Sequence, residues 1–332
     1  MNKNINKNIE LLSPAGSFEC ARAAVDAGAD AVYMGGAKYS ARAYAKSATD
    51  NSLIDSIKFV KGCGKKFYLT VNTLFKQREL KEIFLFLDPI VKLGIDAFIV
   101  QDIGVAMMLK EKYPQVELHA STQMAITSSK AVNLVKALGF TQVVLARELS
   151  LKEIKAIKKE VGDDIKLEAF VHGSMCYCYS GCCLMSSFIG GESGNRGRCK
   201  GPCRLPYRRG EALQAQSTIR RGELCEPAPY ILSMKDMCAL NSLQGLINAG
   251  VTSFKIEGRM RQADYVAGVT KTYRKYLDSI IEANANVVGA KLREPDIAKD
   301  EKYLLELYNK GGFTNYYDKH NGLDMIQLYE RL

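Results

Sequence analysis

The sequence predicts an α/β protein, and specifically a (β/α)8 barrel of the TIM type. Four stretches repeat one pattern: a helix end and a glycine precede a short connector and an apolar strand that ends in polar residues. They are residues 25–36, 91–102, 135–148 and 247–259. The glycine suits a helix C-cap with positive φ, and the apolar run suits a buried parallel strand. Roughly eight such units over about 260 residues favour a closed barrel over an open doubly wound sheet. The first strand is not followed by G-x-G-x-x-G, which weakens the nucleotide-binding alternative.

The remaining elements follow from the same periodicities. Ser17 is placed to cap the first helix. Further strands are predicted at residues 10–13, 66–72, 116–121, 167–172 and 230–233, and helices at 78–87, 151–160, 264–278 and from 303 to a Gly-Gly stop. We therefore expect residues 1–280 to form the barrel, with a Cys- and Arg-rich metal-binding insertion at 174–229 on the C-terminal face of the strands. Residues 281–332 are expected to form a C-terminal helical extension.

Polar side chains follow the predicted strands at the end where (β/α)8 barrels carry their chemistry. This ring contains both signs of charge: Asn72, Gln101, Asp102, Thr122, Gln123, Arg147, Glu148, His172, Lys235, Asp236, Glu257 and Arg259. Arg147 and Arg259 are suited to clamp an anionic small molecule through forked hydrogen bonds.

The composition of the chain indicates its cellular location and the kinds of partner it can bind. The chain has 332 residues, 47% of them hydrophobic, and a formal net charge of +10. It has no apolar run approaching 18 residues and no apolar centre of a signal peptide near its N-terminus, so we expect a cytoplasmic protein with no membrane partner. The positive charge suggests nucleic acid without deciding for it.

Eight of the ten cysteines fall between Cys176 and Cys238. In a reducing cytosol such thiols are metal ligands or free thiols rather than disulfides. The segment lacks the paired C-x2-C of zinc ribbons and the C-x2-C-x2-C run of ferredoxins, so an iron–sulfur cluster, a structural zinc ion and no metal all remain open. Cys20 and Cys63, far from the others in sequence, are predicted to be buried small apolar residues.

Cationic and aromatic residues are interleaved with these cysteines. Arg196, Arg198 and Arg204 lie among them, and Arg208, Arg209, Arg220 and Arg221 follow. This pattern suits either a solvated loop or a phosphate-binding surface. Tyr177, Tyr179 and Tyr207 would either stack on unpaired bases or serve only in packing. His172 is a candidate ligand or acid/base, or a strand-end histidine bonded to backbone. The sequence has no H-E-x-x-H and no G-x-S-x-G, so nothing in it points to a common protease centre.

Several blocks resemble the signatures of the peptidase U32 family, in the expected order over nearly the whole chain. The two most specific are E-x-F-V-H-G at residues 168–173 and N-R-G-x-C-x-x-P-C-R at residues 195–204. The other similar blocks are residues 10–19, 29–36, 176–204, 232–236, 254–260 and 311–314.

The resemblance implies two conflicting functions. The family was named for collagenase-like proteases, whereas other members act in hydroxylation of a tRNA wobble uridine or an rRNA cytidine, with prephenate needed in the bacterial pathways. Related members support ubiquinone hydroxylation and carry a [4Fe–4S] cluster on four cysteines. Carried over to this chain, the ligands fall on Cys176, Cys183 and Cys199, with Cys203, Cys225 or Cys238 as the fourth. Family members also continue into a small C-terminal β domain, so this chain is expected to be a short member or a fragment.

Our interpretation is an iron–sulfur enzyme of RNA base hydroxylation, with Cys176, Cys183, Cys199 and Cys203 as the metal ligands. The predicted catalytic residues are His172, Lys235, Asp236 and Glu257, and the predicted substrate-binding residues are Arg147, Arg196, Arg198, Arg204 and Arg259. The alternatives are a collagenase-like peptidase that uses a metal such as zinc, and a non-enzymatic RNA-binding partner whose cluster only stabilises the fold.

Overall fold

Eight parallel strands close into a barrel in the computed structural model of the protein, which describes residues 9–41, 50–207, 229–284, 296–315, 317 and 325–326. Each of the first seven strands pairs with the next, and the last pairs with both the first and the seventh. The barrel strands are β1 (Glu10–Pro14), β2 (Ala31–Met34), β3 (Lys66–Val71), β4 (Ala97–Val100), β5 (Glu117–Ala120), β6 (Gln142–Val144), β7 (Lys166–Ser174) and β9 (Ser253–Ile256). The predicted (β/α)8 architecture is confirmed.

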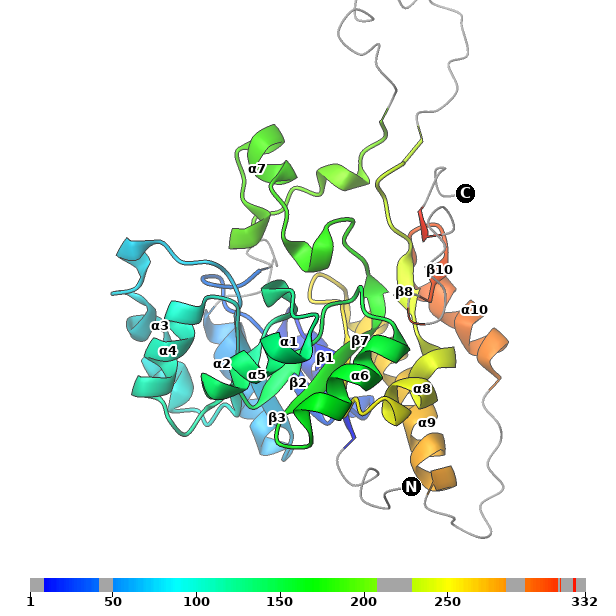
Figure 1. Cartoon of the computed structure of the whole chain (residues 1–332), viewed down its shortest axis with the longest axis horizontal. Coiled ribbons are helices and arrows are strands. Elements are labelled where there is room, and N and C mark those ends of the chain that lie inside the picture. Colours follow the sequence, from blue (N-terminus) through cyan, green and yellow to red (C-terminus); the bar gives the residue numbers. More distant parts are fainter. Residues whose placement is uncertain are drawn as a thin grey trace, which may run out of the picture.

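Helices surround the barrel (Figure 1). They are α1 (Phe18–Asp26), α2 (Asp50–Gly62), α3 (Ile83–Val91), α4 (Ile103–Lys112), α5 (Ser129–Ala137), α6 (Leu151–Val161), α8 (Leu243–Asn248) and α9 (Ala263–Asn284). Ser17 caps α1 as expected, because its side chain accepts a hydrogen bond from the Cys20 amide. The repeated glycines, Gly28, Gly94, Gly139 and Gly250, all have φ between 81° and 96°, so each ends its helix as the pattern predicted. The helix predicted at 78–87 begins later, at Ile83.

Two short strands extend the sheet beside the barrel. β7 is long enough that its last residues, His172–Ser174, pair antiparallel with β8 (Asp236–Cys238). β10 (Phe313–Thr314) pairs parallel with β8, and α10 (Ile297–Leu307) precedes it. The strand predicted at 230–233 is wrong: the Ser233 amide bonds to the Tyr230 carbonyl in a turn. A strand forms only from Asp236 because only there does the chain reach the projecting end of β7.

The barrel interior and its outer surface form separate cores. Inside, Leu12, Ala31, Tyr33, Tyr68, Ala97 and Ile99 pack against one another. Below them the interior is polar, with the Glu10 carboxylate bonded to Lys66 at 3.0 Å and to the Tyr68 hydroxyl at 2.7 Å. The much larger apolar core lies between the strands and the helices. Within the described residues, the helices are too short or too polar to cross a membrane.

Candidate active site

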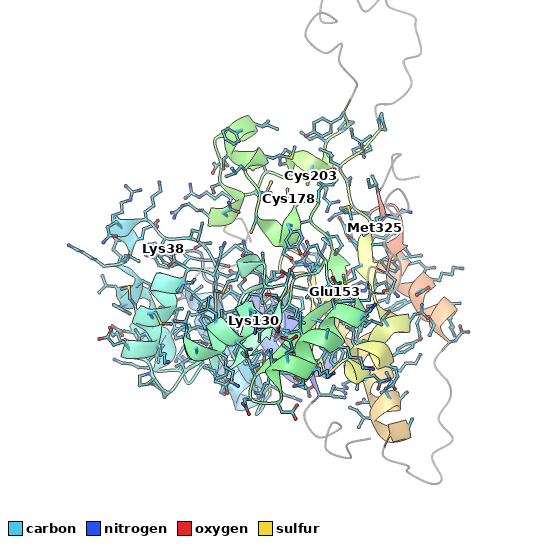
Figure 2. All side chains as sticks on the ribbon, viewed as in Figure 1. Lys38, Lys130, Glu153, Cys178, Cys203 and Met325 are labelled. Atoms are coloured by element: carbon cyan, nitrogen blue, oxygen red, sulfur yellow. The ribbon has the colours of Figure 1, made fainter. Side chains whose placement is uncertain are left out.

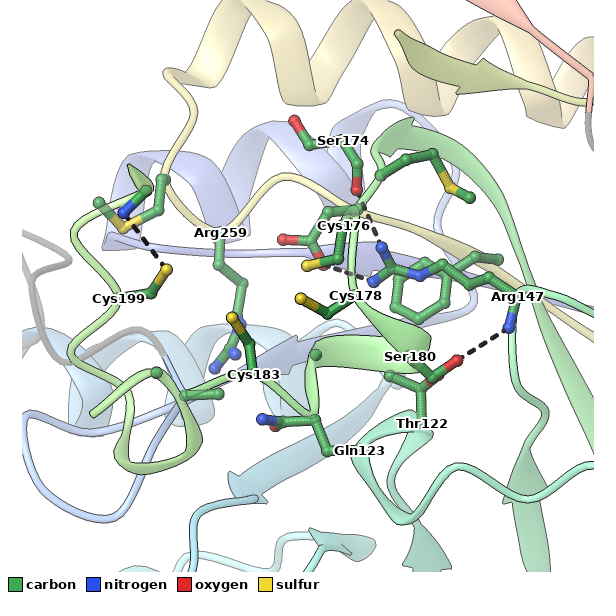
Figure 3. Close-up of a pocket in the computed structure, with 18 of the residues that line it drawn as sticks. Thr122, Gln123, Arg147, Ser174, Cys176, Cys178, Ser180, Cys183, Cys199 and Arg259 are labelled. Carbon is green, nitrogen blue, oxygen red and sulfur yellow. Dashed lines mark hydrogen bonds and ion pairs between the residues drawn. The ribbon is translucent and has the colours of Figure 1, made fainter. Parts of the chain in front are cut away.

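A cavity of about 340 Å³ opens at the carboxyl ends of the barrel strands. Its floor includes residues that follow three different strands: Asn72 after β3, Thr122 after β5 and Glu257 after β9. Its roof comes from residues 174–207, which we call the cap and which contain the short helix α7 (Met185–Gly190). Figure 1 shows the cap standing above the barrel, and Figure 3 shows cap cysteines facing barrel arginines across the cavity.

One end of the cap is fixed by an arginine fork. Arg196 donates to both carboxylate oxygens of Glu79, at 2.5 and 3.0 Å, and to the Leu74 carbonyl at 2.7 Å. Beside it, a Cβ on Gly197 would lie 2.1 Å from the Ser40 carbonyl oxygen, and the φ of Gly197 is +81°. Only glycine fits there, so this residue lets the cap lie directly on the loop that follows β2.

Two further anchors hold the middle and the far end. Glu148, after β6, accepts hydrogen bonds from the Ser180 amide at 2.6 Å and the Ser180 hydroxyl at 2.5 Å. Arg204 donates to the carbonyl oxygens of Met175 and Met234. The cap therefore has a defined position although it contains no strand beyond the end of β7 among its residues.

Five cap thiols line the cavity: Cys176, Cys178, Cys183, Cys199 and Cys203. The Cys183 sulfur accepts a hydrogen bond from the Met185 amide at 3.4 Å, and the Cys199 sulfur accepts one from Gly201 at 3.3 Å. Burial, together with the neighbouring Cys183 thiol, raises the pKa of Cys178 to about 12. Burial also raises the pKa of Cys203, against the opposing effect of Arg204.

The donor set suits a soft metal centre. In the described part of the chain, however, no three His, Cys, Asp or Glu side chains gather closely enough to hold a single metal ion. A four-iron cluster is larger than one ion and carries its thiolates at separate corners. Thiolates that line one cavity are ligands of the kind that such a cluster binds.

The candidates for the fourth ligand occupy different places. Cys203 lines the cavity. Cys238 is buried in β8, with its sulfur accepting from the Tyr273 hydroxyl at 3.8 Å, and does not line the cavity. Cys225 lies outside the described residues, as do Arg208, Arg209, Arg220 and Arg221. Cys20 is buried as predicted, but the same prediction for Cys63 is wrong, because Cys63 is exposed in the turn that ends α2.

The cavity wall is strongly cationic. Its charged residues are Glu257 and six cations: Arg147, Arg204, Lys255, Arg259, Arg261 and Lys310. Arg147 stacks over the Phe170 ring, with its guanidinium carbon 4.1 Å from the ring centre, donates to the Ser174 carbonyl at 2.9 Å and approaches Glu257 at 3.9 Å. Its Nε has no hydrogen-bond partner among the described residues and is buried. An anionic ligand in the cavity would offset the excess positive charge of its wall.

Arg259 stands on the other side of the cavity from Arg147 (Figure 3). It donates to the Ser40 hydroxyl at 2.6 Å and to the Thr70 hydroxyl at 2.7 Å. The two arginines predicted as a clamp thus both face the cavity, held by protein groups that fix their orientation.

Lys255 was not singled out from the sequence, yet it lines the cavity. Its ammonium group lies 2.7 Å from the Glu168 carboxylate and 4.4 Å from the centre of the Tyr33 ring. Burial lowers the pKa of Lys255, and Glu168 only partly offsets this effect. The sequence does contain a pattern that could have identified Lys255. In β9 and just beyond, Lys255, Glu257 and Arg259 alternate with apolar residues and glycine, which places the three charged side chains on one face of the strand.

Three predicted catalytic residues lie outside this cavity. His172 is 1% exposed, and its Nδ1 is 3.3 Å from the Tyr273 hydroxyl. Burial lowers the pKa of His172 to about 3. Asp236 is buried at the start of β8, 3.5 Å from the Lys310 ammonium group, and Lys235 bonds through its backbone to Met325. Of that set, only Glu257 lines the cavity.

The five arginines predicted to bind substrate do not all lie in the cavity. Arg147, Arg204 and Arg259 line the cavity, whereas Arg196 anchors the cap and Arg198 points to solvent.

The family model described as peptidase family U32 matches residues 16–327. The chain belongs to this family. Among curated relatives, the 23S rRNA 5-hydroxycytidine C2501 synthase of Escherichia coli is 40% identical over 284 residues, covering 85% of this chain and 41% of that protein. The tRNA hydroxylation protein P1 of Bacillus subtilis is 37% identical, covering 86% and 66%. A collagenase of Porphyromonas gingivalis is 32% identical, covering 95% and 74%. The chain thus spans less than half of the first relative and about two thirds of the second.

Proposed function

We propose that this chain acts in hydroxylation of an RNA base, a tRNA wobble uridine or an rRNA cytidine, with a [4Fe–4S] cluster held by Cys176, Cys183, Cys199 and Cys203. One observation carries the proposal: the thiols of the cap and the six cations share a single cavity at the barrel mouth. The names of the two relatives with the higher identities support it. An RNA substrate implies action in the cytoplasm.

We assign different roles to different residues of the cavity. When bound, the cluster would supply one-electron transfer. Arg147 and Arg259 would hold an anionic co-substrate such as prephenate, with Lys255 beneath it. Asn72, Thr122 and Gln123 offer hydrogen bonds to the edge of an unpaired base. Glu257 is the carboxylate in the cavity wall and would accept a proton there.

The collagenase relative keeps a peptidase as the second candidate. A peptidase needs a nucleophile with a base, or a catalytic metal. Neither His172 nor His119 lines the cavity, and His119 is buried inside the barrel next to Glu117. The cysteines and cations that line the cavity therefore favour RNA hydroxylation over peptide cleavage.

The first test measures the metal. Protein purified without oxygen should be brown, absorb near 400 nm and contain about four irons per chain. Cys199→Ser should lose most of the iron and sulfide. Cys63→Ser is the matched control, because Cys63 is exposed in the turn after α2 and its replacement should leave the metal content unchanged. A colourless protein with one zinc per chain contradicts the proposal.

The second test measures the reaction. The chain is expressed in an E. coli strain that lacks its own rRNA and tRNA hydroxylation proteins, and nucleosides are analysed by mass spectrometry. We expect a hydroxylated cytidine or uridine to reappear with the wild-type chain and the Cys63→Ser variant, but not with Cys199→Ser. Cleavage of a collagen peptide without any hydroxylated nucleoside would place the peptidase first. A bound cluster with RNA affinity but no modified nucleoside would favour the non-enzymatic role.

A further inference from the structure

The tip of the cap exposes large apolar side chains to water. Phe188 is 84% exposed and Ile189 is 64% exposed, both on α7, and Leu184 immediately before the helix is also exposed. Phe188 is the most exposed large hydrophobic side chain in the described part of the molecule. Burial of such a side chain is favourable, so a cluster of them on a short projecting helix indicates a surface that another molecule covers.

Cations flank this tip. The backbone of Lys200 donates to the Ser186 hydroxyl at 2.9 Å, which ties it to α7. A Cβ at Gly190 would lie 3.8 Å from the Lys200 side chain, so the lysine stem runs beside the end of the helix. Arg198 is exposed, and its guanidinium group lies 3.9 Å from the Glu192 carboxylate, which is a long and weak ion pair. Across residues 174–207 the charged residues are Arg196, Arg198, Lys200, Arg204 and a single carboxylate, Glu192.

The tip is continuous with the cavity mouth. Met185, the first residue of α7, lines the cavity together with Cys183, and so does the exposed Tyr177. Tyr179 is half exposed on the same cap. Figure 2 shows α7 projecting above Cys178 and Cys203, away from the barrel. The apolar tip and the cavity wall therefore share one short segment, α7 and the residues just before it.

Aromatic side chains beside cations are the recognition elements for single-stranded nucleic acid, in which bases stack on rings and phosphates meet lysine or arginine. A protein partner or a second copy of the chain would also cover apolar groups. Arg198 and Lys200 beside the tip, against the one carboxylate of Glu192, favour the polyanion.

We propose that Phe188 and Ile189 form a stacking platform for a base next to the modified nucleotide of an unpaired RNA loop, with Arg198 and Lys200 on its phosphates. This inference rests on the proposed function, since it places the neighbour of the base that enters the cavity.

The experiment is equilibrium binding of a fluorescently labelled RNA hairpin with an unpaired loop. Phe188→Ala should weaken binding about five- to tenfold, because one stacked base is lost. Phe188→Tyr keeps a ring and should stay within about twofold of wild type. Leu85→Ala is the matched control: Leu85 is 79% exposed on α3 and should not change RNA affinity. Fully paired RNA should show no difference between wild type and Phe188→Ala. The iron content of every variant is measured in parallel.

Two results overturn the inference. In the first, Phe188→Ala keeps its iron and binds the hairpin as tightly as wild type. In the second, it leaves RNA affinity unchanged but shifts the sedimentation coefficient, which would make the tip an interface between chains or with a protein. Failure of the proposed function looks different: wild type would bind the hairpin in a Phe188-dependent manner, while no hydroxylated nucleoside is formed in cells.

Discussion

The barrel and the cap are built on different principles. Every barrel strand is paired on both sides by backbone hydrogen bonds. The large core packs on the outside of the barrel, while a small apolar layer from β1–β4 and buried polar pairs such as Lys255–Glu168 fill the inside. The cap has neither a sheet nor a large core among its residues, and its position depends on a few charged side chains: Arg196 on Glu79, Glu148 on Ser180, and Arg204 on two carbonyl groups.

The difference separates stability from function. The barrel can tolerate substitutions at the carboxyl ends of its strands, because the pairing and packing of the strands do not depend on those residues. The cap brings the cysteines to that mouth, so a change in one anchor should alter the site while the barrel stays folded. The following predictions test this division, from the largest expected effect to the smallest.

The largest effect should come from inside the barrel. Lys255→Met leaves the buried Glu168 without its ion-pair partner, so we expect about 3–5 kcal/mol of destabilisation in urea unfolding. The double variant Lys255→Met/Glu168→Gln removes both charges and should recover a large part of that loss. Equal destabilisation in the single and double variants would show that the pair does not act through its charges.

The second effect is acid sensitivity at the junction of β7 and β8. His172 has a folded pKa of about 3, below the unfolded value near 6.5, so the unfolded chain binds the proton first as the pH falls. The stability contributed by this group is present above about pH 6.5 and is lost between there and pH 3, by about 1.4 kcal/mol for each pH unit. His172→Phe should flatten the pH dependence of urea unfolding between pH 6 and pH 4. An unchanged slope would assign the acid loss to other groups.

A smaller global effect is expected for the cap anchors. Arg196→Ala removes three hydrogen bonds to charged or carbonyl groups on a partly exposed surface, which should favour opening of the cap by about 1–2 kcal/mol. Limited proteolysis should cut the cap about tenfold faster, since each 1.4 kcal/mol is a factor of ten, while the urea midpoint of the barrel changes little. Arg198→Ala, an exposed neighbour, is the control. If the urea midpoint falls by as much as the cap opens, the two regions are one cooperative unit.

The smallest effect is on the salt dependence of RNA binding. Replacing Arg198 with alanine removes one cation near the tip of the cap, so the slope of log affinity against log salt should fall by about one. The affinity should drop similarly for all loop sequences, because a phosphate contact carries no base information. A change confined to one sequence would instead indicate a contact to a base.

The accuracy of prediction from the sequence also differs between the barrel and the cap. The barrel was predictable because glycine at a helix end and an apolar run are local signals, and Gly28, Gly94, Gly139 and Gly250 all behave as expected. The strand forms at Asp236 and not at the predicted 230–233, because the projecting end of β7 lies beside Asp236–Cys238. Local propensity does not contain that information.

In the site, residue type was predictable but placement was not. The cysteines of the cap lie together because they lie close in sequence. His172, in contrast, ends its strand's pairing with β9 and turns into a packed environment with Tyr273, away from the cavity. Lys255 was missed because a lysine in an apolar strand looks like an exception until its partner Glu168, 87 residues earlier, is placed beside it.

The interval between β7 and β9 also sets an order of assembly. β9 closes the barrel, yet roughly 80 residues, including the whole cap, separate it from β7, and closing so long a loop carries an entropic cost. During synthesis seven strands can pair before the closing strand exists, and the cysteines emerge while the barrel is still open along one edge. The anchors that hold the cap to Leu74 and Glu79 after β3, and to Glu148 after β6, would shorten the remaining loop. Anchoring of the cap and closure of the barrel are therefore steps whose order can be measured in the folding kinetics of the nascent chain.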